Sequence, residues 1–404
     1  MKIVVLKFGG TSVGTIEKIK KVTDIIIEHK KKKNKVIVVS SAMSGVTNDL
    51  IKKSKQISNN FIDSEYDVLV SSGEQVACSL IAGRLNHKGF KSRSWLGWQI
   101  PIFTNGPYTN SRIQQVNKNK LLRFLKEGGI PIITGFQGVN KNERVTTIGR
   151  GGSDASAIMI AKSFKAQRCI IYTDVEGVYT TDPNKLKKAK KIKVISYEEM
   201  LEMASLGAKV MQPVSIQDAR LNRINIEVKS SFIKKPGTLI TKRTNLNNNR
   251  IITGISSTHN DAKVTLVGVK DRPGVAASIF KPLSINSINV DMVVQNISPN
   301  GKETDLTFTI KAEDLNKTKK IIQENKSIKF KKVLFQKGVS KISIIGVGMI
   351  TTPGVTFRMF QALANKKINI QVISTSEIKI SVLINKKDAK KALVTLHKEF
   401  KLQE

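Results

Sequence analysis

The chain has 404 residues, of which 40% are hydrophobic and 5% aromatic, and this length predicts two or three domains with buried cores. Its 68 lysines and arginines against 31 aspartates and glutamates give a formal net charge of +37. The lysines are spread along the chain without interleaved aromatic residues, so we expect non-specific binding of polyanions but no specific nucleic-acid function.

Cysteine and histidine usage argues against metal and disulfide chemistry. Cys78 and Cys169 are far apart and outside any C-x-x-C pattern, and the four histidines form no cluster, so we predict neither a disulfide framework nor a metal site. No signal peptide and no apolar segment long enough to cross a membrane is evident, which predicts a cytoplasmic protein without membrane association.

The first predicted strand, KIVVL, runs into KFGGTSVG at residues 7–14. Apolar residues then recur at three- and four-residue spacing from Ile16 to Ile26, which predicts a helix ending near Lys33 rather than a returning hairpin strand. Glycines at such a strand-to-helix junction can offer backbone amides to a phosphate, with Lys7, in an exposed loop, as a point charge beside them. A tight turn without a ligand is the alternative.

A second strand, KVIVVSS, leads into VVSSAMSGVTNDL at residues 38–50, whose hydroxyls suit either substrate contact or helix capping. A helix predicted over 73–85 places Glu74 in its first turn. There, a carboxylate either caps the helix dipole or binds a substrate ammonium.

After the predicted strand at 130–134, the segment TIGRGGSDASA at 147–157 combines glycines with Arg150 and Asp154 before a helix to Ala166. A guanidinium there suits bidentate binding of a carboxylate or phosphate. Asp154 is either an N-cap or a partner that orients the Lys7 ammonium. The strand RCIIYTD then enters the turn-rich YTDVEGVYTTDP at 172–183, whose carboxylates and tyrosine suit a nucleotide pocket or a surface loop.

The alternation of strands and helices up to about residue 240 predicts an α/β domain with a mainly parallel sheet. The polar stretch at 241–250 indicates a domain boundary. Beyond it, the segment from Lys263 aligns with the segment from Lys341. Each copy predicts the order βαββαβ of a ferredoxin-like domain. The duplication suggests regulation, with dimerisation alone as the alternative.

Eight motifs in this order resemble the aspartokinases, the ATP-dependent kinases of the aspartate β-carboxylate. They are KFGGTSV, SSAMSGVTN, SSGE, GFQG, GRGGSDASA, YTDVEGVYTTDP, GAKVMQP and STSEIKISVL, and they cover essentially the whole chain. The resemblance implies an amino-acid-kinase-like αβα sandwich over 1–245, followed by two ACT domains over 260–337 and 338–404.

The resemblance also implies roles for individual residues. The catalytic residues would be Lys7 and Asp154. The ATP site would comprise Lys7, Gly9, Gly10, Thr173, Asp174, Tyr179, Asp182 and Lys209. The aspartate site would comprise Ser41, Thr47, Glu74, Arg150, Gly152 and Ser153. The effector site would comprise Asp271, Gln295 and Asn296. Two departures, Gln212 in place of the usual histidine and Val214, fall near the expected nucleotide side.

The implied ligands are L-aspartate, ATP and Mg²⁺ carried mainly by the phosphates, with lysine, threonine or both as inhibitors. We expect a homo-oligomer assembled through the ACT domains. Because no methionine lies between Met211 and Met292, no ordinary internal start is available for a second, smaller subunit. The alternatives are a kinase of glutamate or N-acetylglutamate with the same fold, a non-catalytic amino-acid sensor, and a nucleic-acid binder.

Overall fold

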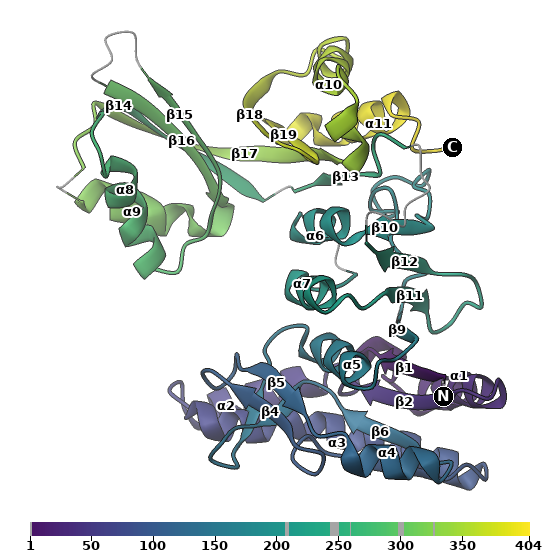
Figure 1. Ribbon diagram of the computed structural model, residues 1–404. Coiled ribbons are helices and arrows are strands. Elements are labelled where there is room, and N and C mark those ends of the chain that lie inside the picture. Colours follow the sequence, from purple (N-terminus) through teal and green to yellow (C-terminus); the bar gives the residue numbers. More distant parts are fainter. Residues whose placement is uncertain (1, 207–209, 243–249, 259, 298–302, 326–327) are drawn as a thin grey trace. The chain divides into compact units, whose positions relative to one another are not determined.

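The computed structural model describes residues 2–206, 210–242, 250–258, 260–297, 303–325 and 328–404 (Figure 1). The chain divides into two compact units. Unit 1 comprises Met1–Tyr179 and Lys191–Asn248, and unit 2 comprises Thr180–Lys190 and Asn249–Glu404. The first domain predicted from the sequence, 1–245, included residues 180–190, which the structure groups with unit 2.

Unit 1 is built on an eight-stranded sheet in the order β10-β12-β11-β9-β1-β2-β6-β3. Every neighbouring pair is parallel except β11 and β12, which confirms the mainly parallel sheet. The strands are β1 (Ile3–Phe8), β2 (Lys35–Ser40), β3 (Ser92–Trp95), β6 (Ile130–Thr134), β9 (Arg168–Thr173), β10 (Val194–Ser196), β11 (Ile226–Ser230) and β12 (Thr238–Thr241).

Helices cover both faces of this sheet, because successive residues of a strand point to opposite sides. Leu6 of β1 contributes to one core with α1 and α3, whereas Val5 contributes to the other with α4 and α5. The result is the predicted αβα sandwich. The helices of unit 1 are α1 (Ile16–Lys31), α2 (Val46–Ile57), α3 (Asp63–His87), α4 (Asn119–Lys126), α5 (Gly152–Ser163), α6 (Tyr197–Ser205) and α7 (Pro213–Asn222).

A second, four-stranded sheet in unit 1 was not anticipated from the sequence. Its order is β5-β4-β7-β8, formed by β4 (Ile102–Asn105), β5 (Arg112–Val116), β7 (Gln137–Val139) and β8 (Val145–Thr147). These strands have only three to five residues each, too few for an alternating pattern to be evident in the sequence.

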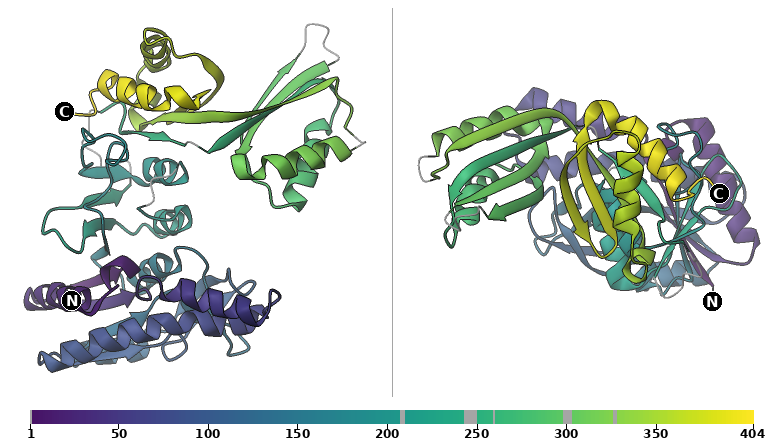
Figure 2. Two further views of the ribbon diagram at one scale, coloured as in Figure 1. Left: turned by 180° about the vertical axis from the view of Figure 1, so that it is seen from behind. Right: turned by 90° about the horizontal axis from the view of Figure 1, so that it is seen from above.

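Unit 2 contains one sheet in the order β15-β16-β14-β17-β19-β18, with β13 paired to β17. Figure 2 gives two further views, in which α8 and α9 lie beside the strands of the first repeat. The strands are β13 (Gly254–Ser257), β14 (Asp261–Lys270), β15 (Val290–Ile297), β16 (Glu303–Lys311), β17 (Lys332–Ile345), β18 (Ile370–Ser376) and β19 (Lys379–Asn385). The helices are α8 (Val275–Ile285), α9 (Leu315–Glu324), α10 (Val355–Ala364) and α11 (Ala389–Glu399).

The two repeats share β17, and the last strand of the second repeat is β13, which comes from an earlier part of the chain. The first part of β17 pairs with β14 of the first repeat, whereas its second part pairs with β19 and with β13. The second repeat was predicted to contain its sixth element within 338–404, but that strand is β13, which precedes the first repeat. Without β13, the backbone of β17 would present an unpaired edge.

The segment Thr180–Lys190 is held within unit 2 by several hydrogen bonds. The Ile255 amide donates to the Thr180 carbonyl at 2.7 Å, and the Thr180 hydroxyl lies 3.0 Å from Nε2 of His397 in α11. Lys185 donates to the Ser257 carbonyl at 3.0 Å.

Across the described residues, none of the helices has the length and the apolar character of a membrane span.

Candidate active site

A cavity of about 770 Å³ lies in unit 1, where the carboxyl ends of parallel strands meet the start of α5. Ligands of open parallel sheets bind at this edge. Its lining comes from segments spread over most of unit 1, and the fold brings together every predicted catalytic and aspartate-site residue and one predicted ATP-site glycine. The catalytic and aspartate-site residues are Lys7, Ser41, Thr47, Glu74, Arg150, Gly152, Ser153 and Asp154, and the glycine is Gly10.

Lys7 and Asp154 form a buried ion pair in this cavity. The Lys7 Nζ lies 2.6 Å from the Asp154 Oδ1, and both side chains are about one-tenth exposed, at 11% and 10%. Lys7 belongs to β1, so the prediction of an exposed loop lysine was wrong. Asp154 is the third residue of α5, whose N-cap is Gly151 with φ of +78°. Asp154 is therefore paired with the lysine ammonium and is not the N-cap of the helix.

The backbone at the glycines after β1 forms a 3-10 helix that the sequence does not predict. Residues Gly10–Ser12 form a short 3-10 helix, and α1 begins only at Ile16 after the N-cap Thr15. The Gly9 amide donates to the Tyr172 carbonyl at 3.1 Å. It is therefore not free to bind a phosphate, and Gly9 does not line the cavity, whereas Gly10 does.

Glu74 is a buried carboxylate in the middle of α3. The sequence predicts a helix beginning at Gly73, but α3 begins at Asp63, so Glu74 cannot cap the helix dipole. Gly73 permits close packing instead, because a Cβ there would lie 2.9 Å from the Ala42 Cβ. The Glu74 Oε1 accepts a hydrogen bond from the Ala42 amide at 3.1 Å, and Oε2 has no hydrogen-bond partner among the described residues.

The pKa of Glu74 follows from this burial. Removal from water raises the pKa to about 7, although the Ala42 amide partly stabilises the charged form. A buried carboxylate with one unoccupied oxygen is suited to a cationic ligand, which would restore the ionised form. Arg150, at the same cavity, is exposed and has no ion pair with any described residue. The cavity therefore offers both a cation-binding and an anion-binding group.

Asp67 organises one wall of the cavity, and sequence reasoning missed it. Its carboxylate accepts hydrogen bonds from the Thr109 amide at 2.9 Å and from the Thr147 amide and hydroxyl at 2.9 and 2.6 Å. Both threonines line the cavity. Burial raises the pKa of Asp67, and these hydrogen bonds oppose the rise. The sequence offered no signal for it, because the predicted helix began only at Gly73 and Asp67 lies before that residue in α3.

The residues predicted to contact the nucleotide follow β9. Thr173 ends this strand and its hydroxyl donates to Asp174 Oδ1 at 3.0 Å. Asp174 is exposed and Tyr179 is partly exposed. None of these three residues lines the 770 Å³ cavity.

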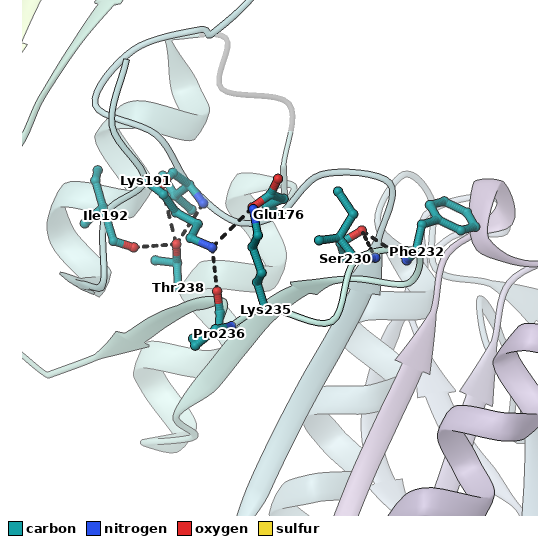
Figure 3. Close-up of polar contacts among 10 residues, drawn as sticks. Glu176, Lys191, Ile192, Ser230, Phe232, Lys235, Pro236 and Thr238 are labelled. Atoms are coloured by element: carbon teal, nitrogen blue, oxygen red, sulfur yellow. Dashed lines mark hydrogen bonds and ion pairs between the residues drawn. The ribbon is translucent and has the colours of Figure 1, made fainter. Parts of the chain in front are cut away.

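The loop between Asp174 and Tyr179 is held by hydrogen bonds and an ion pair to neighbouring segments (Figure 3). The Thr238 hydroxyl accepts from the Val178 amide at 2.8 Å and donates to the Ile192 carbonyl at 2.6 Å. Lys191 donates to the Pro236 carbonyl at 2.6 Å and lies 3.5 Å from Glu176 Oε2. This network fixes the backbone on which Asp174 and Tyr179 lie.

Comparisons with known proteins show the family of the chain. Residues 2–230 match the model of the amino acid kinase family, and residues 264–325 and 342–400 match an ACT domain model. The aspartokinase of Geobacillus stearothermophilus is 43% identical over 404 residues, covering 100% of this chain and 98% of the relative. The chain belongs to the aspartokinase family. An aspartate kinase of Pseudomonas fluorescens strain SBW25 is 44% identical over 406 residues, with coverage of 100% and 98%.

Solved structures of aspartokinases have the same fold. Escherichia coli aspartokinase III in complex with aspartate and ADP matches with a TM-score of 0.79 at 26% identity, covering 98% of this chain and 99% of that one. The same enzyme with lysine and aspartate matches with a TM-score of 0.82 at 26% identity and the same coverage.

Four further residues were named from the family resemblance, namely Asp182, Lys209, Gln212 and Val214. Asp182 belongs to unit 2, where its carboxylate accepts from the Asn184 amide at 2.9 Å. Lys209 lies outside the described residues. Gln212, a departure from the family pattern, lines the cavity and is the N-cap of α7, whereas Val214 is exposed on that helix.

The three predicted effector residues are exposed in unit 2. Asp271 lies between β14 and α8, whereas Gln295 and Asn296 lie on β15 opposite Leu306 and Asp305. Within the described part of the chain, no group of three histidine, cysteine, aspartate or glutamate side chains could hold a metal ion.

Proposed function

We propose that the cavity of unit 1 catalyses transfer of the γ-phosphoryl group of ATP to the β-carboxylate of L-aspartate, giving 4-phospho-L-aspartate. This is the reaction of the aspartokinase family, the first step toward lysine, threonine and methionine. The observation that carries the proposal is the convergence, in one cavity, of the Lys7–Asp154 pair with a buried carboxylate and an exposed guanidinium.

Aspartate carries one ammonium and two carboxylates, and the cavity has a complementary set. Arg150 binds the α-carboxylate through its bidentate fork, and Glu74 binds the α-ammonium. The β-carboxylate is then directed toward Lys7. The lining also includes the smaller residues predicted for the aspartate site, namely Ser41, Thr47, Gly152 and Ser153.

The reaction requires little acid or base catalysis. A carboxylate is already ionised at neutral pH, so one oxygen attacks the γ-phosphorus directly, and the bond to the β,γ-bridging oxygen breaks as ADP leaves. Lys7 stabilises the negative charge on the transferred group, and Asp154 keeps its ammonium in position. The aspartate and ADP bound to aspartokinase III of E. coli support these ligands.

ATP binds as its magnesium complex. We assign the nucleotide to the Lys7 side of the cavity and to Thr173, Asp174 and Tyr179. Asp182 and Lys209, which the family resemblance also implies, stay predictions. Mg²⁺ is usually bound by one or two carboxylates together with substrate phosphates, so the phosphates of ATP would supply most of its protein-independent ligands. The cytoplasm, where ATP is abundant, is the expected location.

Unit 2 regulates this reaction. The lysine complex of E. coli aspartokinase III supports lysine as an inhibitor, and we propose lysine, threonine or both for this chain. Asp271, Gln295 and Asn296 are the candidate contacts, at an interface between ACT domains of paired subunits in a homo-oligomer. A ligand inhibits only if it binds the less active state more tightly.

Arg150→Lys tests the assignment of the aspartate side. An ammonium cannot reproduce the bidentate fork, so the aspartate KM should rise by about tenfold or more while the ATP KM stays within about twofold. The measurement is ATP-dependent formation of aspartyl hydroxamate over both substrate concentrations. Arg144→Lys is the matched control, because Arg144 pairs with Glu65 outside the cavity. A raised ATP KM with an unchanged aspartate KM would contradict the assignment.

A further inference from the structure

A second cavity in unit 1 contains both tryptophans of the chain. It has a volume of about 540 Å³ and lies between the edge strand β3, the turn that follows it, and α4. Only two of the 404 residues are tryptophan, and Trp95 and Trp98 both line this cavity together with Phe124. It shares no lining residue with the candidate active site.

The aromatic side chains of this cavity have different exposure. Trp95 is buried and contacts Phe124 edge to face, with ring centroids 5.8 Å apart. Trp98 is 52% exposed, which is unusual for the largest apolar side chain. An exposed indole beside a cavity of this size offers a surface on which a planar ligand can stack.

Three cationic side chains line the cavity together with these aromatic rings. Arg93, Lys120 and Arg123 line the cavity, and the Arg93 guanidinium lies 4.1 Å from the Trp95 ring centroid. Neither arginine has an ion pair with a carboxylate of any described residue. The one acidic lining residue, Glu127, is paired with Lys91 at 2.7 Å and also interacts electrostatically with Arg123. With three cationic lining residues and one acidic one, the lining carries a net positive charge.

The turn that carries Trp98 is fixed by hydrogen bonds. The Gln99 side chain accepts from the Leu96 amide at 3.0 Å, and its carbonyl accepts from the Lys120 ammonium at 3.1 Å. The second bond joins the turn to α4. The two walls of the cavity are thus held together before any ligand binds, which lowers the entropic cost of binding.

Aromatic side chains beside two guanidiniums are suited to a ligand that is both planar and anionic. Arginine binds phosphate bidentately and indole stacks on an aromatic base. A second copy of the chain would bring the same three cations against each other in a symmetric interface, which is unfavourable. We propose that this cavity binds a nucleotide, with its base on Trp98 and its phosphate between Arg93 and Arg123.

The two tryptophans allow a direct test with AMP as the probe. Tryptophan fluorescence of the full chain should be quenched saturably by AMP, and adenosine or inorganic phosphate alone should bind about tenfold more weakly, because each lacks half of the interactions. Arg123→Gln should weaken AMP binding by about fivefold or more. Lys126→Gln is the matched control, since Lys126 is an exposed cation of the same helix that does not line the cavity.

Arg93→Gln provides an independent variant, and equilibrium dialysis with labelled AMP provides a second readout. Absence of saturable AMP binding would overturn the proposal. So would equal losses in Arg123→Gln and Lys126→Gln, because they would indicate attraction to the general positive charge. A single-stranded oligonucleotide that binds while AMP does not would also reject a mononucleotide site, and would indicate a nucleic-acid surface instead.

Discussion

Glu74 combines burial with an oxygen that has no hydrogen-bond partner among the described residues, and this predicts how aspartate binding depends on pH. Its pKa of about 7 lies above the usual 4.5, so the folded chain binds an extra proton between these values. The stability contributed by the neutral form is present below about pH 4.5 and is lost as pH rises to about 7. Binding of the substrate ammonium requires the charged form and therefore favours higher pH.

The aspartate KM of the wild-type chain should accordingly rise about tenfold for each pH unit below 7, since one proton must leave Glu74 on binding. Glu74→Gln should have a KM at least about tenfold higher at pH 8 and should lose this dependence. Initial rates across pH 5.5 to 8.5 would measure both. A Gln variant with the wild-type KM and the same pH profile would exclude Glu74 as the ammonium partner.

At the scale of elements, the loop before Tyr179 depends on one hydroxyl from β12. Thr238→Val removes the partner of the Val178 amide and of the Ile192 carbonyl, leaving two buried polar groups unsatisfied. We expect the ATP KM to rise about threefold to tenfold with the aspartate KM unchanged. Thr238→Ser, which keeps the hydroxyl, should behave as wild type. Equal changes in both KM values would show that the hydroxyl only stabilises the fold.

Elements with strong local patterns could be predicted from the sequence, and those decided by distant contacts could not. The strand at 130–134 follows from an apolar run. The helix α5 follows from the glycines that mark its start. The start of α3 was misplaced because Gly73 reads as a helix boundary, whereas it serves close packing against Ala42. The hydrogen bond from the Gly9 amide to the Tyr172 carbonyl could not be predicted, because these two residues are far apart in the sequence.

For the molecule as a whole, the repeat in the sequence predicted the two ferredoxin-like halves of unit 2. It did not predict the strand pairing that joins them. The pairing of β13 with β17 joins residues before the first repeat to the second, and an alignment of the two copies contains no information on a strand outside both. The grouping of Thr180–Lys190 with unit 2 has the same origin. Its contacts are with β13 and α11, which follow much later in the chain.

We predict that the full chain phosphorylates the β-carboxylate of aspartate. The most direct measurement is NMR of aspartate labelled with ¹³C in its side-chain carboxylate, incubated with MgATP and the protein, with ADP quantified in parallel. We expect one 4-phospho-L-aspartate for each ADP, and no acyl phosphate from glutamate or N-acetylglutamate at comparable rates. No acyl phosphate from aspartate, or faster transfer to either of the other two acceptors, would contradict it.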